Sequence, residues 1–229
     1  DDVDAGRYKP LRAGVSLQYA NREPRFYASV GFNGSVWNMT SLGNKQGATQ
    51  PNQQVWYYRG TSEGYNGGNR IFTGIGIKKY VNPYDAKYQN ELLYRQKAEP
   101  AIRYAEILLI YAEALNELTS GQVYHLTTYT GADVEIQRSV DEMRYAIKRI
   151  RMRAGVPDYS EETYNNPNDF RVKLKRERQI ELLGENSMRY FDLRRWKDAM
   201  TEENQLLQGC NINISDDETC IADFYKQTI

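Results

Sequence analysis

The sequence predicts a mainly α-helical protein in which helix pairs follow a long irregular region with short β-strands. From about residue 100 onward, apolar residues recur at helical spacing between capping and stop signals. Residues 1–98 are instead rich in Gly, Asn, Tyr and Thr and show no sustained period. We therefore expect a loop-rich region at 1–98, a helical scaffold at 99–200 and an irregular segment at 201–229, together forming one structural unit.

The first two helices of the scaffold are expected to form an antiparallel pair. The first spans 102–118 after Pro100, and the second begins at Ser139, which stands in capping-box spacing with Glu142. Gly155 is expected to end the second helix. The pair resembles a tetratricopeptide-type unit, although the 34-residue signature of that motif does not repeat in this chain.

Two shorter helical segments are expected to follow. Asn168 or Asp169 can cap a third helix that ends near Gly184, and a short fourth helix runs to about Met200. The apolar faces of the first three helices are predicted to comprise Ile102, Ala105, Leu109, Ala112, Leu115, Val140, Met143, Ile147, Ile150, Phe170, Leu174, Ile180 and Leu183.

Short β-strands are expected in the first half, at 25–32 and 70–81, where β-branched and aromatic residues concentrate. The segment between them has no hydrophobic period and is predicted to form long loops. Its Trp and Tyr content argues against disorder, and loops of this length inside a domain are usually functional.

The overall composition excludes several classes of protein. Thirty basic and thirty acidic side chains cancel, so no global field favours nucleic acid or an anionic membrane. Nineteen tyrosines and three tryptophans in a chain that is only 40% hydrophobic favour a recognition surface built from aromatic rings. Cys210 and Cys220 could close a disulfide or remain two thiols, and they do not form the ligand pattern of a zinc site.

The charged run at 177–196 raises the question of an acidic active site. Glu177, Glu181 and Glu185 stand four residues apart, which would place like charges on one helix face. They could hold a metal ion or act as general acids, or they could pair with Arg149, Arg151 and Arg153 of the preceding helix. We favour the ion pairs, because no further oxygen ligands are marked nearby. Acidic residues also interleave with the basic ones, unlike a surface that binds nucleic acid.

No motif for covalent or metal-dependent catalysis occurs in the chain. His125 is the only histidine and belongs to no recognisable signature. We therefore expect no catalytic residues, no metal site and no cofactor, and a protein that is not an enzyme.

Four stretches of the chain resemble the SusD/RagB family in sequence, order and spacing. They are EPRFYASVGFNGSVW at 23–37, GIGIKKYVNP at 74–83, IRYAEILLIYAEALNEL at 102–118, and IRMRAGVPDYS at 150–160 followed by ERQIELLGENSMRYFDLRRW at 177–196. The resemblance implies a mostly helical fold whose tetratricopeptide-like helix pairs form an α-α superhelix and support an irregular binding region. It also implies a lipoprotein on the outer-membrane surface that binds oligosaccharide and serves a SusC-like TonB-dependent transporter.

The resemblance further implies that family members are about twice as long as this chain. The family's amino-terminal half, with its lipid-carrying cysteine, would precede Asp1, and its usual carboxy-terminal segment would follow Ile229. Asn186 stands where the family commonly has glycine.

The aromatic residues between the two predicted strands are the candidates for a sugar-binding site, because flat rings pack against the apolar faces of sugars. Trp37 could instead anchor a loop to the core. The candidates are Trp56, Tyr58, Tyr65, Tyr57, Trp37, Asn66 and Arg59, with Asn38 and Asn69 beside them.

These residues favour a non-catalytic protein that binds oligosaccharide or starch-like polysaccharide. Two alternatives remain: a binding protein for peptides or another nutrient on the same scaffold, and, less favoured, a carbohydrate-active enzyme. The latter would require a pair of carboxylates that face a cleft of sugar size.

Overall fold

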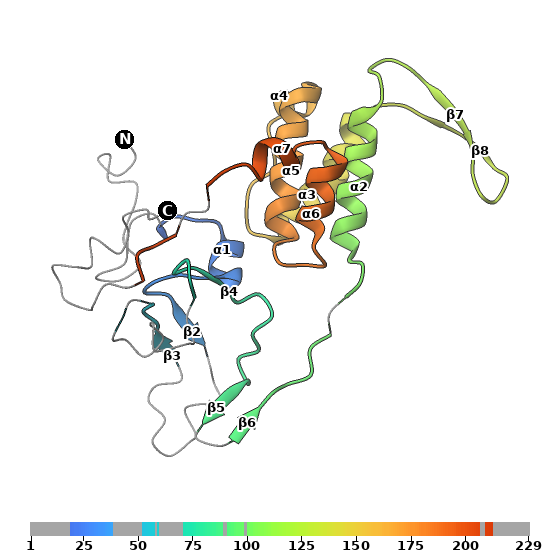
Figure 1. The fold of residues 1–229 in the computed structure, drawn as a ribbon. Coiled ribbons are helices and arrows are strands. Elements are labelled where there is room, and N and C mark those ends of the chain that lie inside the picture. Colours follow the sequence, from blue (N-terminus) through green and yellow to red (C-terminus); the bar gives the residue numbers. More distant parts are fainter. Residues whose placement is uncertain are drawn as a thin grey trace. The chain divides into compact units, whose positions relative to one another are not determined.

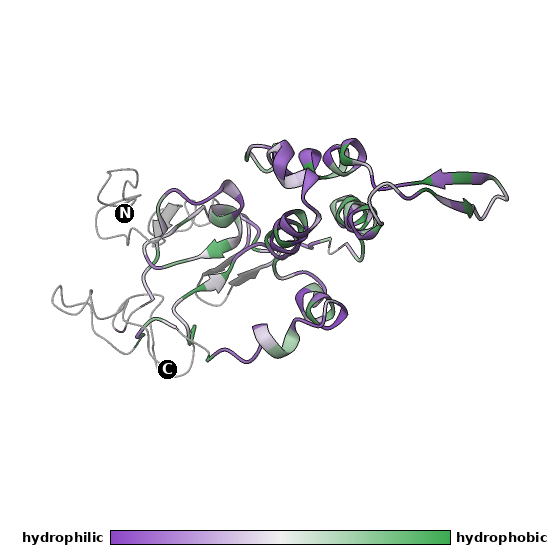
Figure 2. Cartoon of the chain, turned by 90° about the horizontal axis from the view of Figure 1, so that it is seen from above, coloured by the Kyte–Doolittle hydropathy of each residue, from purple (hydrophilic) through white to green (hydrophobic). Residues whose placement is uncertain are grey.

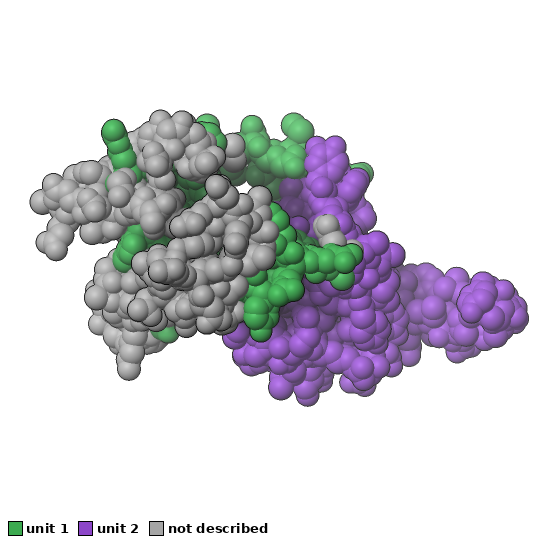
Figure 3. All heavy atoms as spheres, turned by 90° about the horizontal axis from the view of Figure 1, so that it is seen from below, with its two compact units in different colours: residues 1–22, 26–99, 196–229 green, residues 23–25, 100–195 purple. Residues whose placement is uncertain are grey.

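The computed structural model describes residues 19–38, 52–57, 59, 71–88, 91–98, 100–206 and 209–212. The chain divides into two compact units (Figure 3). Residues 1–22, 26–99 and 196–229 form what we call the loop-rich unit, and residues 23–25 and 100–195 form the helical unit.

Most residues of the described elements lie in helices, and the short strands pair two by two (Figure 1). The helices are α1 Pro24–Ser29, α2 Tyr104–Glu117, α3 Val140–Arg153, α4 Glu161–Asn165, α5 Pro167–Glu181, α6 Met188–Arg195 and α7 Ala199–Glu202. The strands are β1 Val30–Gly31, β2 Val36–Asn38, β3 Asn52–Gln54, β4 Gly76–Ile77, β5 Ala86–Tyr88, β6 Glu91–Leu93, β7 Tyr124–Thr127 and β8 Asp133–Ile136. The antiparallel pairs are β1–β4, β2–β3, β5–β6 and β7–β8.

The core of the helical unit lies where α2 packs against α3 and α5, with α4 closing against α3 and α5. Leu109, Met143, Ile147 and Phe170 are fully buried there. Hydrophobic and hydrophilic residues alternate around these helices, as expected of amphipathic segments (Figure 2). The predicted apolar faces are therefore largely confirmed, except that Ile102 lies before α2 and is 67% exposed. Ile180 and Leu183 are only half-buried, and Leu183 lies beyond the end of α5.

The ends of α3 and α5 follow the capping rules. Ser139 caps α3, and its side chain accepts a hydrogen bond from the backbone N–H of Glu142, as the sequence predicts. Gly155 follows α3 with a φ of +72°, a conformation that favours glycine. The cap of α5 is Asn166 rather than Asn168 or Asp169, because Pro167 occupies the first turn and needs no N–H partner there.

Three local expectations were wrong. Residues 25–32 contain the helix α1 followed by a two-residue strand, since Pro24 starts a helical turn despite the β-favouring side chains after it. The run at 70–81 contributes only the two residues of β4. The expected fourth helix is split into α6 and α7, and Lys197 between them has a φ of +62° that no regular helix allows.

A β-hairpin connects α2 to α3 and extends away from the helices (Figure 1). The sequence analysis did not predict it. Its strands pair Leu126 with Val134 on one face and His125 with Glu135 on the other. The turn is closed by hydrogen bonds between Thr128 and Ala132.

The loop-rich unit contains two small apolar clusters. Tyr19 and Phe32 are buried with their rings 4.6 Å apart. A second cluster gathers Val55, Tyr57 and Ile212. None of the described helices is long and apolar enough to cross a bilayer.

Candidate functional site

The acidic run lies inside the helical unit, where arginines surround it. Glu177 and Glu181 belong to α5, and Glu185 lies in the turn that follows, so only the first two share a helix face. The exposed fractions of Glu177, Glu181 and Glu185 are 1%, 3% and 6%. Such buried charges persist only when they are paired, so their partners decide what the run can do.

Glu177 is held from two sides. Its Oε1 accepts a hydrogen bond from Nη1 of Arg25 at 2.7 Å, and its Oε2 accepts one from Nη1 of Arg151 at 2.7 Å. The hydroxyl of Tyr159 donates to the same Oε2 at 3.0 Å. Burial raises the pKa of Tyr159, and the nearby Glu177 carboxylate raises it further, so this hydroxyl keeps its proton and remains a donor.

Glu181 and Glu185 share Arg103. Its Nη1 donates to Glu181 at 3.0 Å, while its Nε and Nη2 each donate to Glu185 at 2.7 Å in a bidentate pair. Arg25 and Arg153 also donate to Glu181. Burial alone would raise the pKa of Glu181, but the hydrogen bonds from Arg153, Arg103 and Arg25 outweigh it and hold the pKa below its usual value.

The predicted ion pairs are confirmed for Arg151 and Arg153, whereas Arg149 instead lies over the ring of Tyr145. The sequence analysis missed Arg25 and Arg103, which are 152 and 82 residues away from their partners in the chain. We call the resulting set the arginine–glutamate cluster; it comprises Arg25, Arg103, Arg151, Arg153, Glu177, Glu181 and Glu185.

A second group of buried charges continues this pattern at α6. Arg178 donates to Asp192 at 2.8 Å, and both side chains are buried. Arg195 also donates to Asp192, at 2.9 Å, and it reaches Glu113 of α2. These pairs tie α6 to α5 and α2 and leave Asp192 engaged by two arginines.

Asn186 shows how the chain accommodates the turn after α5. Its φ is +40°, which explains why glycine would fit there. Its Nδ2 donates to the backbone carbonyls of Pro100 and Ala101, both at 3.1 Å. Asn186 therefore adopts a backbone conformation that favours glycine, and its side chain forms two hydrogen bonds to the segment before α2.

The candidate aromatic residues of the loop-rich unit divide by burial. Tyr57 is 5% exposed and belongs to the second apolar cluster, and Trp37 and Trp56 are half-buried against it. Arg59 is exposed. Asn38 pairs with Asn52 through the strands β2 and β3.

The remaining candidates, Tyr58, Tyr65, Asn66 and Asn69, lie outside the described residues, and so does Cys220. Cys210 is half-buried, and burial raises the pKa of its thiol. The disulfide between Cys210 and Cys220 stays a prediction.

Neighbouring residues hold the aromatic residues in place, and the sequence analysis did not single them out. Asn33 is buried and accepts a hydrogen bond from the backbone N–H of Tyr57 at 2.8 Å. A Cβ on Gly31 would lie 2.8 Å from Trp37 and 2.9 Å from Tyr57, so only glycine fits beside both rings. The Lys78 ammonium lies 5.8 Å from the centroid of the Trp37 ring.

In the part of the chain that the structure describes, no three His, Cys, Asp or Glu side chains gather so that they could hold a metal ion. His125 lies on the exposed hairpin, 3.5 Å from Glu135.

The fold and its buried ion pairs define a mostly helical scaffold that carries a loop-rich region. The chain belongs to the SusD family, whose model matches residues 7–227.

Solved structures agree with this assignment. A SusD-like protein, BF3747 from Bacteroides fragilis NCTC 9343, is 29% identical with a TM-score of 0.58, and the match covers 84% of this chain and 31% of that one. BT4246 is 23% identical in two structures. Its selenomethionine form has a TM-score of 0.69 over 95% of this chain and 34% of that one, and the other form has 0.68 over 95% and 33%. The chain thus spans about a third of the length of these structures. No curated protein matches it.

Proposed function

We propose that this protein binds an oligosaccharide at the cell surface without cleaving it and delivers it to a SusC-like TonB-dependent transporter. As expected of the family, it would be lipid-anchored in the outer membrane. The arginine–glutamate cluster is the observation that supports the proposal that the protein does not cleave its ligand. Its three carboxylates are the acidic run that could have formed an active site, and each accepts hydrogen bonds from at least one arginine while buried. A glycosidase needs two carboxyl groups that face the substrate.

The proposed sugar contacts come from the aromatic residues of the loop-rich unit. Trp56 is half-buried and packs against the cluster of Val55, Tyr57 and Ile212, so the residue is held in place without being fully enclosed. The Asn33 bond to Tyr57 fixes the backbone next to it. A ring that is already held in place loses little conformational entropy on binding, which suits reversible capture of a sugar.

A panel of polysaccharides tests the function directly. The protein is incubated with each polymer, and both retention on the immobilised polymer and release of soluble products are measured. We expect retention of at least one polymer without product. Product release would establish an enzyme, and binding of peptides with no retention of any polysaccharide would favour the peptide-uptake alternative.

The position of the site is tested by Trp56→Ala and Tyr65→Ala. Each is expected to weaken binding of the retained oligosaccharide by about 1–3 kcal/mol, by analogy with aromatic stacking on nucleic-acid bases. Tyr94→Ala is the matched control, because Tyr94 lies in the same unit and is 69% exposed. Unchanged affinity in both folded variants, measured by calorimetric titration, would move the site elsewhere.

The proposed partner is tested by purification from outer membranes. Under mild detergent, the full-length protein should bring with it a large TonB-dependent barrel. Recovery of the protein alone would count against a stable complex with a transporter.

A further inference from the structure

A groove runs between the start of α2 and the end of α3 in the helical unit, with a volume of about 630 Å³. Leu108 and Ile150 form an apolar floor, and both are buried. Tyr104 stands beside them with 63% of its surface exposed. The volume is within the range of small-molecule sites, and grooves between helices are common places for them.

The walls of this groove carry positive charge. Arg103, Arg149 and Arg153 line it, and none of the described residues that line it is acidic. Glu181 neutralises Arg153, and Glu185 together with Glu181 neutralises Arg103. One cation, Arg149, is therefore left without a carboxylate in the described structure.

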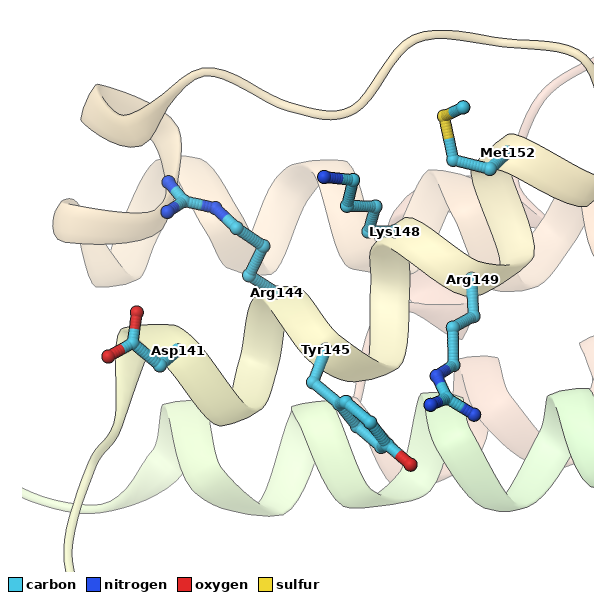
Figure 4. Close-up of a pocket in the computed structure, with 6 residues that line it drawn as sticks. All are labelled: Asp141, Arg144, Tyr145, Lys148, Arg149 and Met152. Atoms are coloured by element: carbon cyan, nitrogen blue, oxygen red, sulfur yellow. The ribbon is translucent and has the colours of Figure 1, made fainter.

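The guanidinium of Arg149 is held in place by an aromatic ring. Its central carbon lies 3.9 Å from the centroid of the Tyr145 ring. Figure 4 shows both side chains extending from α3 towards α2, whereas Lys148 extends to the other side of α3. A guanidinium that packs on a ring keeps its N–H groups available at its edge, and this planar fork fits the two oxygens of a carboxylate.

The same residues offer a complementary surface for a sugar. The exposed ring of Tyr104 can pack against the C–H face of a pyranose, and the buried Leu108 and Ile150 exclude water beneath it. A neutral sugar would leave the charge of Arg149 uncompensated. A sugar that carries a carboxylate would satisfy both the ring and the cation.

We propose that the α2–α3 groove binds a carboxylate-bearing oligosaccharide, with Tyr104 against a sugar ring and Arg149 on the carboxylate. This rests on the proposed function and adds to it a second site, separate from the aromatic residues of the loop-rich unit, together with the class of ligand.

The test is calorimetric titration of the whole chain with a galacturonic-acid oligomer and with a neutral galactose oligomer of the same length. The acidic oligomer should bind more tightly, and its affinity should fall as salt is added. Arg149→Gln should lower that affinity by about tenfold or more, because a hydrogen bond to a charged group is lost. Tyr104→Ala should lower it as well.

Lys148→Gln is the matched control, since Lys148 is an exposed cation one residue away that does not line the groove. It should change the affinity less than twofold. If the acidic oligomer binds and neither Arg149→Gln nor Tyr104→Ala lowers its affinity more than Lys148→Gln does, the proposed site is wrong. Binding of the neutral oligomer alone would overturn the ligand class and leave the proposed function standing, whereas failure to bind either oligomer or any polysaccharide of the panel would overturn both.

Discussion

The interactions that stabilise the helical unit differ from those that stabilise the loop-rich unit. The helical unit has one continuous apolar core, and the buried arginine–glutamate cluster links residues as distant as Arg25 and Glu181. The loop-rich unit has small aromatic clusters and side chains that bond to the backbone, such as Asn33 to Tyr57 and Asp85 to Arg95. A rigid frame that supports adaptable loops is a common division of labour in binding proteins.

The same contrast supports the proposal that the run of glutamates stabilises the fold and does not act in catalysis. In the helical unit, arginines donate hydrogen bonds to the buried carboxylates, and Arg103 binds Glu185 in a bidentate pair. In the loop-rich unit, the residues that we propose for recognition include the partly exposed Trp37 and Trp56. We therefore expect perturbations of the first unit to change stability and perturbations of the second to change binding.

The largest effect is expected when a buried pair of the helical unit is broken. Glu177→Ala leaves Arg25 and Arg151 without their shared carboxylate, and the free energy of unfolding should fall by about 3–5 kcal/mol. Glu117→Ala is the matched control, because its pair with Arg171 is exposed and should contribute about 1 kcal/mol or less. Denaturant unfolding of both variants measures the difference, and equal losses would contradict the role given to the cluster.

A core truncation should also distinguish the two units. Leu109 is fully buried at the centre of the helical unit, so Leu109→Ala should cost about 2–5 kcal/mol. Val55→Ala should cost less, because Val55 belongs to a small cluster and the substitution removes fewer carbon atoms. Hydrogen exchange should show the Leu109 effect across α2, α3 and α5. A larger loss in the free energy of unfolding from Val55→Ala than from Leu109→Ala would contradict the view that the helical unit is the more rigid of the two.

Removal of the α3 cap should have a smaller effect. Ser139→Ala deletes the acceptor for the N–H of Glu142 and should lower the free energy of unfolding by about 1 kcal/mol. Ser139→Asp should preserve most of the stability, since Asp also caps helices well. Thermal unfolding of the two variants side by side checks this, and equal destabilisation would show that the cap is not used.

Acid should weaken the helical unit through Glu181. Its pKa is held below the usual value in the folded protein, so the ionised form stabilises the fold above the unfolded pKa of about 4.3. That stabilisation is lost as the pH falls below this value and through the folded pKa. In Glu181→Gln the fall of the melting temperature in acid should be shallower. Identical profiles for the two proteins would exclude Glu181 as a source of acid sensitivity.

The sequence predicts the helical unit well because its signals are local. Ser139 and Glu142 stand three residues apart, and the apolar face of α3 follows the helical period, so neighbours in the chain decide the structure. The sequence predicted two of the four arginine partners of the glutamates, Arg151 and Arg153, which belong to the end of α3. The other two, Arg25 and Arg103, come from elements that only the tertiary fold brings close.

The loop-rich unit could be predicted only in outline. Pro24 outweighed the β-favouring residues after it, and the strands of two or three residues have no period to detect. In the candidate site, aromatic composition marked Trp56 and Tyr57 alike, although only the tertiary packing shows that Tyr57 is buried and Trp56 half-buried. No sequence pattern marked Asn33 or Gly31, because their contacts with Trp37 and Tyr57 form only in the tertiary structure.

The most direct test of the account is one variant read out in two ways. Glu177→Gln keeps the shape of the side chain but removes the charge that holds Arg25 and Arg151. Its melting temperature and its affinity for a polysaccharide retained by the wild-type protein are both measured, the affinity well below the melting transition. We predict a lower melting temperature with unchanged affinity and no released product. An unchanged melting temperature together with lost binding, or wild-type product release that the substitution abolishes, would contradict the claim that these carboxylates hold the fold rather than act on a ligand.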